Sequence, residues 1–386
     1  MKVLIYIYKM CFGPLTRIFH WGPLTAIGII KLVSGMTIHC CGMWWPSTTF
    51  GGLLNTLSFT SLAGLTLYNF LSAMFLGPGF LPKGWQPDNK ENTGNLQWCS
   101  VCEGFKAPRS HHCRRCGRCV LKMDHHCPWI NNCVGWGNHG HFTYFLLFAT
   151  LGCSHATVVL SCSLYRSFYR LHYLYYGTGK EPIVVLGLIG KILTVFGLGF
   201  SIGVVIAVGL LLFFQVRGIL RNRTGVEDWI LEKAQYRRRN SSTKFIFPYN
   251  VGIINNFWQV LNLSCQPHGN GIEWPVVEGC DQYTLTREQI EQKREKRMRT
   301  KVYQIIEPSS GSYFPISKGL RTCMNFPCTD EPRIKLNVGD IVLVTRWRTH
   351  WLFGEKVPTD QNSDRIRGWF PRTCAKEVEN KRRKEE

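Results

Sequence analysis

Side chains that can bind a metal or act as a nucleophile are concentrated between positions 99 and 133. Eleven cysteine and histidine residues lie there: Cys99, Cys102, His111, His112, Cys113, Cys116, Cys119, His125, His126, Cys127 and Cys133. Two cysteines separated by two residues, with a histidine nearby, are typical of tetrahedral zinc sites, because a tight turn brings both thiolates to one ion. Two such ions need eight donors, so three remain in excess. The run Asp124-His125-His126-Cys127 places a thiol close to an imidazole, which is the arrangement of an activated nucleophile.

The complete spacing of this window resembles that of a known family. The run Cys99-x2-Cys102-x9-His112-Cys113-x2-Cys116-x2-Cys119-x4-Asp124-His125-His126-Cys127-x5-Cys133 is followed by Pro128-Trp129. It is similar to the cysteine-rich domain of the DHHC-type protein S-acyltransferases (palmitoyltransferases). Every ligand position of the family pattern is occupied at its usual spacing.

This resemblance implies two structural zinc ions, each bound by three cysteines and one histidine. One ion would be held by Cys99, Cys102, His112 and Cys119, and the other by Cys113, Cys116, His126 and Cys133. A closed site of this kind has no open position for water. Zinc is therefore expected to fold and fix the surrounding loops and not to activate water.

The resemblance also implies the chemistry. Cys127 would attack the thioester of a long-chain acyl-CoA, with His125 as the base and Asp124 orienting the imidazole. The acyl group would then pass to a cysteine on the cytosolic side of a membrane protein. A base is needed because an ordinary thiol, with a pKa of ~8.5, is mostly protonated at neutral pH. The residues expected at the CoA end are Lys106, Arg109 and His111, for the phosphates, and Trp129, at the mouth of the acyl site.

The composition of the chain indicates a membrane protein. Its 386 residues carry a formal net charge of +21, and 45% of them are hydrophobic and gathered in stretches almost free of charge. A basic chain can also bind nucleic acid, but apolar runs of ~20 residues indicate a bilayer, and we expect no nucleic-acid partner. Cysteines clustered for metal binding indicate a reducing compartment.

Four segments are long and apolar enough to cross the bilayer, at about 22–43, 50–76, 142–164 and 194–215. The segment between the second and third spans has an excess of Lys and Arg, so the positive-inside rule places the zinc ligands in the cytosol. Because the third span begins soon after Cys133, Cys127 is expected near the membrane surface, with the acyl chain among the helices beneath it. The predicted fold is a polytopic α-helical membrane protein with four transmembrane helices, a cytosolic two-zinc cysteine-rich domain and a C-terminal small β-barrel (SH3-like) domain.

The segment after the last span is expected to be cytosolic. Thr224-Gly225-x-Glu227 resembles the Thr-Thr-x-Glu motif of the family, and Asn256 resembles its C-terminal asparagine; Thr224 and Glu227 are expected to make structural contacts. Further on, alternating apolar residues and the run Gly368-Trp369-Phe370-Pro371 predict the SH3-like domain. Trp369 and Pro371 are its candidate residues for a polyproline groove, and a protein partner for this domain is an expectation.

These interpretations divide the chain into seven parts: 1–21, a cytosolic N-terminus; 22–76, helices one and two; 77–141, the zinc domain; 142–216, helices three and four with a lumenal loop; 217–301, a juxtamembrane segment and basic linker helix; 302–378, the SH3-like domain; and 379–386, a basic tail. The tail resembles a dibasic retrieval signal, and a DHHC-type enzyme with an SH3-like domain resembles the member of the family in the endoplasmic reticulum membrane. The alternative is a catalytically silent membrane adaptor that uses zinc only structurally.

Overall fold

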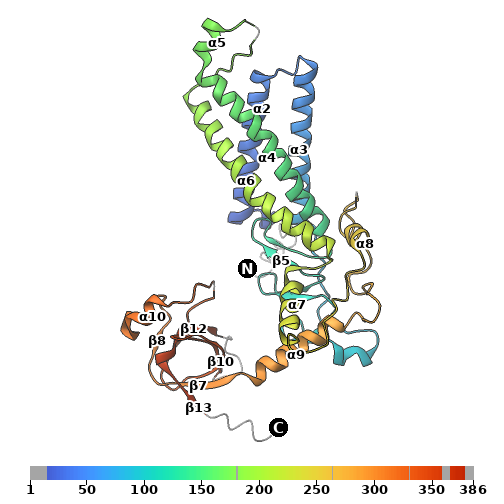
Figure 1. Cartoon of the computed structure of the whole chain (residues 1–386), viewed down its shortest axis with the longest axis vertical. Helices are drawn as coiled ribbons and strands as arrows, with labels where there is room; N and C mark the ends of the chain where they lie inside the picture. Colours follow the sequence, from blue (N-terminus) through green and yellow to red (C-terminus); the bar gives the residue numbers. More distant parts are fainter. Residues whose placement is uncertain (1–14, 180, 263, 330, 359–365, 379–386) are drawn as a thin grey trace, which may run out of the picture. The chain divides into compact units, whose positions relative to one another are not determined.

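The computed structural model of the chain describes residues 15–179, 181–262, 264–329, 331–358 and 366–378. The chain divides into two compact units, Met1–Glu288 and Gln289–Glu386, and Figure 1 shows the elements of each. Most of the predicted N-terminal segment and the whole basic tail, with its dibasic signal, lie outside the described residues.

The first unit contains four long apolar helices. They are α2 (Trp21–Trp44), α3 (Phe50–Phe75), α4 (His139–Phe168) and α6 (Leu188–Leu220). At ~1.5 Å per residue, each is long enough to cross a hydrocarbon core of ~30 Å. The prediction of four membrane-spanning helices is thus confirmed by length and composition. α4 and α6 extend beyond the predicted spans at both ends.

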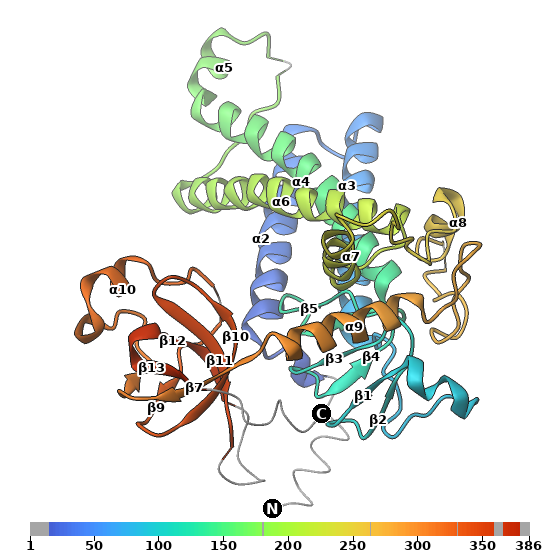
Figure 2. The same ribbon diagram turned by 60° about the horizontal axis from the view of Figure 1, so that its bottom comes forward.

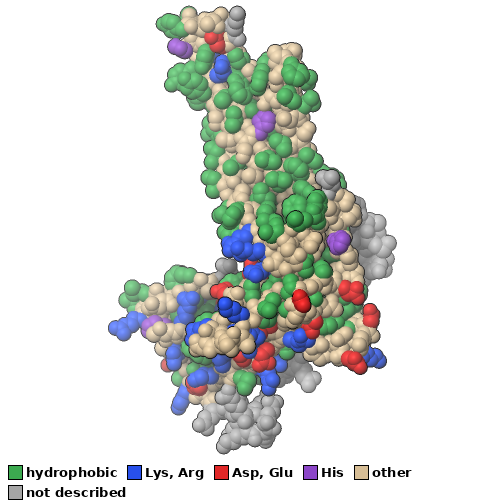
Figure 3. Space-filling view, turned by 45° about the vertical axis from the view of Figure 1, so that its right-hand side comes forward, with side chains coloured by type: hydrophobic (Ala, Val, Ile, Leu, Met, Phe, Trp, Pro, Cys, Tyr) green, Lys and Arg blue, Asp and Glu red, His purple; other side chains and the backbone are tan. Residues whose placement is uncertain are grey.

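The helices run side by side, and α4 contacts the other three (Figure 1). Their outer surface is apolar and nearly free of charged side chains (Figure 3), with exposed residues such as Leu54, Val158 and Ile206. In water such a surface would be unstable, whereas in lipid it is the expected one. The short helix α5 (Arg170–Tyr176) joins α4 to α6 at the end of the bundle opposite the zinc-ligand region.

Three two-stranded antiparallel hairpins carry the metal-ligand residues. They are formed by β1 (Gln97–Cys99) with β2 (Gly104–Lys106), β3 (His111–Cys113) with β4 (Arg118–Val120), and β5 (His125–Cys127) with β6 (Asn132–Val134). Figure 2 shows the hairpins grouped at one end of the bundle. The buried side chains around the first two hairpins form only small clusters, about half of whose members are cysteines. Ile130 and Val134 of the third hairpin instead join a larger cluster with residues of the helices. The first two hairpins have little apolar core, so bound metal ions are expected to contribute much of their stability.

Further helices follow α6 in the first unit. α7 (Gly225–Arg237) begins with a capping box, in which Thr224 caps the Glu227 amide and the Glu227 carboxylate accepts from the Thr224 amide. α8 (Ile253–Trp258) contacts α6. The charged helix α9 (Thr284–Met298) crosses the boundary between the two units, close to the predicted linker helix.

The second unit is rich in strands, as predicted. A five-stranded antiparallel sheet has the order β12 (Arg367–Pro371), β11 (Trp351–Lys356), β10 (Ile341–Trp347), β7 (Lys301–Ile305) and β13 (Ala375–Val378). The short strands β8 (Ser309–Ser310) and β9 (Lys335–Leu336) pair separately, and α10 (Leu320–Met324) lies between them in the sequence. Within the described residues no pairing joins β12 to β13, so a closed barrel is not found.

Trp369, a candidate residue for a polyproline groove, is not available for that role. Trp369 is only 3% exposed. It packs with Trp351 and Phe353, and its Nε1 donates to Glu331 Oε2 at 2.9 Å. Because the ring is part of the core, it cannot present a flat face to a proline-rich peptide.

Candidate active site

The β5–β6 hairpin brings the three predicted catalytic residues together. His125 Nδ1 lies 2.7 Å from Asp124 Oδ2, and the His125 ring lies near enough to Cys127 for the two side chains to interact electrostatically. Cys127 is 6% exposed, whereas the His125 side chain is 41% exposed. The predicted nucleophile is thus buried, while the predicted base is partly accessible to solvent.

The electrostatics of the Asp–His pair favour an ionised state. Burial opposes ionisation of Asp124, but the hydrogen bond and charge of His125 outweigh it and lower the pKa of Asp124 to about 2. Burial likewise disfavours the imidazolium, but Asp124 and Cys127 outweigh it and raise the pKa of His125 to about 10. At neutral pH the proton therefore resides on His125, next to the Cys127 sulfur.

Asp124 has a second partner, from a distant part of the sequence. The Gly225 amide at the start of α7 donates to Asp124 Oδ1 at 2.8 Å. One carboxylate oxygen of Asp124 thus hydrogen-bonds His125, and the other accepts from the start of α7. The predicted structural role of the Thr224–Glu227 segment is explained here, since its capping box shapes the turn that presents this amide.

Arg109 is the residue that fixes α7 against the zinc-ligand region. Its guanidinium binds Glu227 with two hydrogen bonds, of 2.6 and 2.8 Å, and both side chains are 0% exposed. It also donates to the Asn222 side chain and backbone carbonyl and stacks over the rings of Tyr249 and Trp274. The expectation that Arg109 binds CoA phosphates is therefore wrong, because the side chain is inaccessible and fully engaged.

Lys122 is a second buried cation in this region. It is 4% exposed, and its ammonium group lies 5.2 Å from the centre of the Trp274 ring. Burial, followed by the charge of Arg109, lowers the pKa of Lys122 to about 7, and Glu227 and Asp124 partly offset this shift. Lys122, Arg109 and Glu227 thus form a polar cluster near Asp124, and this cluster links Asp124 to α7.

Two groups of side chains could hold metal ions, and they are the two predicted ligand sets. Cys99, Cys102, His112 and Cys119 place their donor atoms within 4.8 Å of one another, as do Cys113, Cys116, His126 and Cys133. Zinc bonds of ~2.3 Å to sulfur and ~2.05 Å to nitrogen at tetrahedral angles imply about 3.5 Å between the sulfur and nitrogen atoms. The distances from His112 Nδ1 to its three sulfur partners are 3.5, 3.4 and 3.9 Å, and those from His126 Nδ1 are 3.7, 3.5 and 3.6 Å. The two clusters therefore fit tetrahedral zinc.

The β5–β6 hairpin is tied to the helices by contacts that sequence reasoning missed. The Asn132 side-chain amide donates to backbone carbonyls at the end of α3, among them Met74 O at 3.1 Å and Leu76 O at 3.0 Å. Asn138, directly before α4, donates to Ala73 O at 3.0 Å. Both asparagines are at most 1% exposed. Their positions next to a zinc-ligand cysteine and a helix start are the only local signals of this role.

α2 approaches the same hairpin closely. A Cβ atom at Gly22 would lie 2.0 Å from the Pro128 carbonyl oxygen, so no larger residue fits there. The ring of Trp21 makes an edge contact with Trp129, at 5.4 Å between ring centres. The segment just after Cys127 is therefore positioned directly against the first helix.

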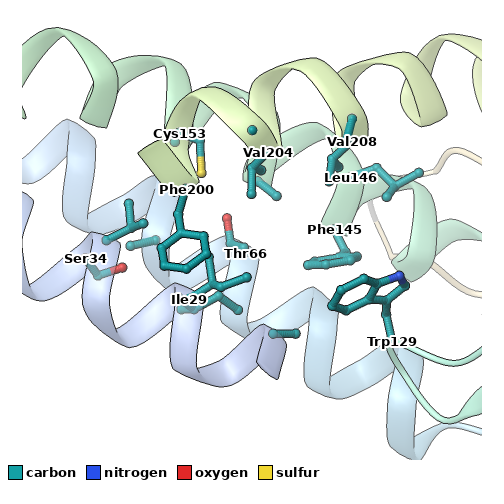
Figure 4. A pocket seen from close by; sticks show the side chains of 18 of the residues that line it. Ile29, Ser34, Thr66, Trp129, Phe145, Leu146, Cys153, Phe200, Val204 and Val208 are labelled. Carbon is teal, nitrogen blue, oxygen red and sulfur yellow. The ribbon is translucent and has the colours of Figure 1, made fainter. Parts of the chain in front are cut away.

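An apolar cavity of about 310 Å³ opens beside Cys127. All four long helices line it, together with Cys127 and Trp129. Figure 4 shows Trp129 and Phe145 toward one end of the cavity, with Phe200, Ile29 and Ser34 further along. Its volume is in the range of small-molecule sites, and its apolar lining suits a hydrocarbon chain.

The other residues predicted at the CoA end are less clearly assigned. Lys106, half-buried in β2, lies close enough to His112 for its charge to act on that ring, and so borders the first ligand cluster. His111 is half-buried in β3 and pairs with Val120 in the hairpin. Of the four predicted residues, Trp129 lies at the cavity.

Comparisons with known proteins agree with this architecture. Residues 92–232 match the family model described as DHHC palmitoyltransferase. Palmitoyltransferase ZDHHC6 of Mus musculus and of Homo sapiens are each 46% identical over 377 residues, covering 93% of this chain and 91% of the relative. Probable protein S-acyltransferase 15 of Arabidopsis thaliana is 33% identical over 224 residues, or 56% of this chain and 83% of that protein. Relatives of this similarity along nearly the whole chain establish that it belongs to the DHHC palmitoyltransferase family.

Proposed function

We propose that this palmitoyltransferase works through an acyl-enzyme on Cys127. The observation that carries the proposal is the position of this thiol, which borders the apolar cavity and lies two residues from His125, whose ring is held by Asp124. A reactive sulfur between a base and a hydrocarbon-binding cavity is what transfer of a fatty acyl group requires.

The first half-reaction would form a thioester on the enzyme. The Cys127 thiolate attacks the carbonyl carbon of a long-chain acyl-CoA, and the carbon–sulfur bond to CoA breaks. The proton held by His125 then passes to the departing CoA thiolate. Asp124 stabilises the imidazolium throughout, by its hydrogen bond and its charge.

In the second half-reaction, a cysteine thiol of a protein substrate takes the place of CoA. His125 accepts its proton, the new thiolate attacks the Cys127 thioester, and the acyl group leaves with the substrate. Because each half-reaction breaks one thioester and forms another, the overall reaction is nearly thermoneutral. Positioning and thiolate formation therefore account for most of the catalysis.

The membrane and the two metal sites would support this chemistry. The acyl chain extends into the cavity between the helices, since each methylene gains ~0.8 kcal/mol in hydrocarbon. Zinc in the two clusters would cross-link hairpins that have little core, and so hold Asp124, His125 and Cys127 in place. Lys106 and His111 remain candidates for contacts with the CoA phosphates.

We further propose that the zinc domain and both termini face the cytosol, and that the enzyme resides in the endoplasmic reticulum membrane. The orientation follows from the excess of Lys and Arg in 77–141 and after the last span. The location is suggested by the similarity of this chain to palmitoyltransferase ZDHHC6 and by its basic tail. The C-terminal unit would be an SH3-like module that docks a protein partner by a surface other than a polyproline groove.

The experiment is hydroxylamine-sensitive labelling of the purified full-length protein with a palmitoyl-CoA analogue. Wild type and Cys162→Ser, which removes a thiol of α4 outside both metal clusters, should be labelled equally. Cys127→Ser should not be labelled. Label that persists in Cys127→Ser would place the acyl group on another cysteine and reject the proposed intermediate.

A further inference from the structure

One aromatic ring contacts both the predicted base and the cavity. Phe142 lies near the start of α4 and is 4% exposed. Its ring meets the His125 imidazole edge to face, with 5.3 Å between ring centres and 69° between the planes. The same residue lines the cavity together with Cys127 and Trp129.

His125 needs a contact of this kind to hold its orientation. Its hydrogen bond to Asp124 fixes one ring atom, Nδ1. An imidazole held at one atom can still pivot about that bond and move its other nitrogen away from the Cys127 sulfur. A ring packed at an angle against its face restricts this pivoting, because such aromatic contacts have a preferred geometry.

Phe142 packs against protein on one side and borders the cavity on the other. The rings of Phe70, Phe145 and Phe142 form a row, with 5.2 and 6.4 Å between successive centres, and the row ends at His125. Phe142 belongs to the same buried cluster as Ile130 and Val134, and it lines the cavity beside Phe145. A hydrocarbon chain in the cavity would add packing on the cavity side of Phe142, since dispersion contacts are lost wherever a ring faces a void.

We propose that Phe142 is a positioning residue that couples acyl-chain occupancy to the orientation of His125. A chain that fills the cavity packs against Phe142, and Phe142 holds the imidazole toward Cys127. The rate of thioester formation then depends on whether a hydrocarbon chain fills the cavity, and not only on how tightly acyl-CoA binds. This inference rests on the proposed Cys127 mechanism and adds to it how the substrate's own hydrocarbon promotes the reaction.

The test compares Phe142→Leu and Phe142→Met with Phe145→Leu in the full-length zinc-loaded protein. Phe145 lines the same cavity, but its ring contacts Phe70 and Phe142. Steady-state CoA release with palmitoyl-CoA should show kcat lowered about 10-fold or more in both Phe142 variants, with KM changed little, because misplacement of a catalytic group reduces the chemical step. Phe145→Leu should chiefly raise KM. The advantage in kcat of palmitoyl-CoA over acetyl-CoA should shrink only in the Phe142 variants.

Two controls keep the test decisive. Zinc content and thermal stability establish that each variant is folded. Leu and Met have similar volumes but different shapes, so a loss of kcat in both variants reflects the lost ring. The inference is overturned if the Phe142 variants change KM alone, as Phe145→Leu does, or if only one of them lowers kcat. Labelling of Cys127 in these variants separates this failure from a failure of the acyl-enzyme mechanism, which would abolish dependence on Cys127 altogether.

Discussion

The amide of Gly225 donates a hydrogen bond to Asp124 Oδ1 at 2.8 Å, although the two residues lie 101 positions apart in the sequence. The other oxygen of the same carboxylate lies 2.7 Å from His125 Nδ1. The orientation of the base therefore depends on the start of α7. Because Arg109 binds Glu227 in the first turn of that helix, a buried ion pair indirectly positions the reacting thiol.

The first prediction concerns this ion pair. Arg109→Met leaves the Glu227 carboxylate buried without its partner, and breaking a fully buried pair costs ~3–5 kcal/mol. We expect a strongly lowered melting temperature and loss of self-acylation. The matched control is Arg114→Met, which removes an exposed arginine of the same region and should leave both unchanged. A stable and active Arg109→Met protein would show that α7 does not need this anchor.

The second prediction concerns the Asp124–His125 pair and its pH dependence. In the wild type, His125 keeps its proton up to a pH of about 10, set by its raised pKa. The positive charge beside Cys127 thus persists through neutral and mildly alkaline pH, and alkylation of Cys127 by iodoacetamide should vary little between pH 7 and 9. Asp124→Asn removes the charge that supports the imidazolium, so His125 should lose its proton at a lower pH and leave the Cys127 sulfur without a neighbouring positive charge.

The expected result for Asp124→Asn is slow alkylation at pH 7 that rises as the pH approaches 9. Acyl transfer at pH 7 should fall by roughly 10²–10⁴-fold, as when the orienting carboxylate of a catalytic triad is lost. Equal pH profiles for the two proteins would contradict the ionisation state derived from the geometry. Mass spectrometry of the Cys127 peptide measures the alkylation directly.

The third prediction is that the protein binds two zinc ions, one in each ligand cluster. Wild type should contain two zinc ions per chain, measured by elemental analysis, and Cys99→Ser and Cys113→Ser should each lose one. Cys162→Ser should retain two. A strong chelator should abolish self-acylation together with the protease resistance of the hairpin region, because the first two hairpins have little apolar core of their own. Full activity without metal would refute the structural role of zinc.

The sequence was sufficient for the elements whose signals are local. The ligand spacing resembles that of a known family, which implied two sets of four donors, and the structure brings together the same two sets. Four apolar stretches predicted four helices, because a hydrocarbon solvent leaves few alternatives for an apolar segment of that length. For the helices the information lies within one segment, whereas each metal cluster combines donors from two successive hairpins.

The errors arose where a side chain's partner is distant in sequence. Arg109 appeared to be a surface cation in a basic domain, yet its partner Glu227 is 118 positions away and removes it from solvent. Trp369 resembled a groove residue, yet Glu331 and two aromatic neighbours place it in a core. Asn132 gave no signal beyond its position next to a zinc-ligand cysteine, because its acceptors are carbonyls freed by the end of α3, which only the fold brings close.

The central claim is that Cys127 carries the acyl group between two partners. The direct measurement is a chase: the enzyme is loaded with a palmitoyl-CoA analogue, freed of CoA, and mixed with a cysteine-containing membrane substrate, while the acylated Cys127 peptide is followed by mass spectrometry. The account predicts that the acyl group leaves Cys127 and appears on the substrate without further acyl-CoA. An acyl-Cys127 that persists while the substrate is modified only on renewed addition of acyl-CoA would contradict it.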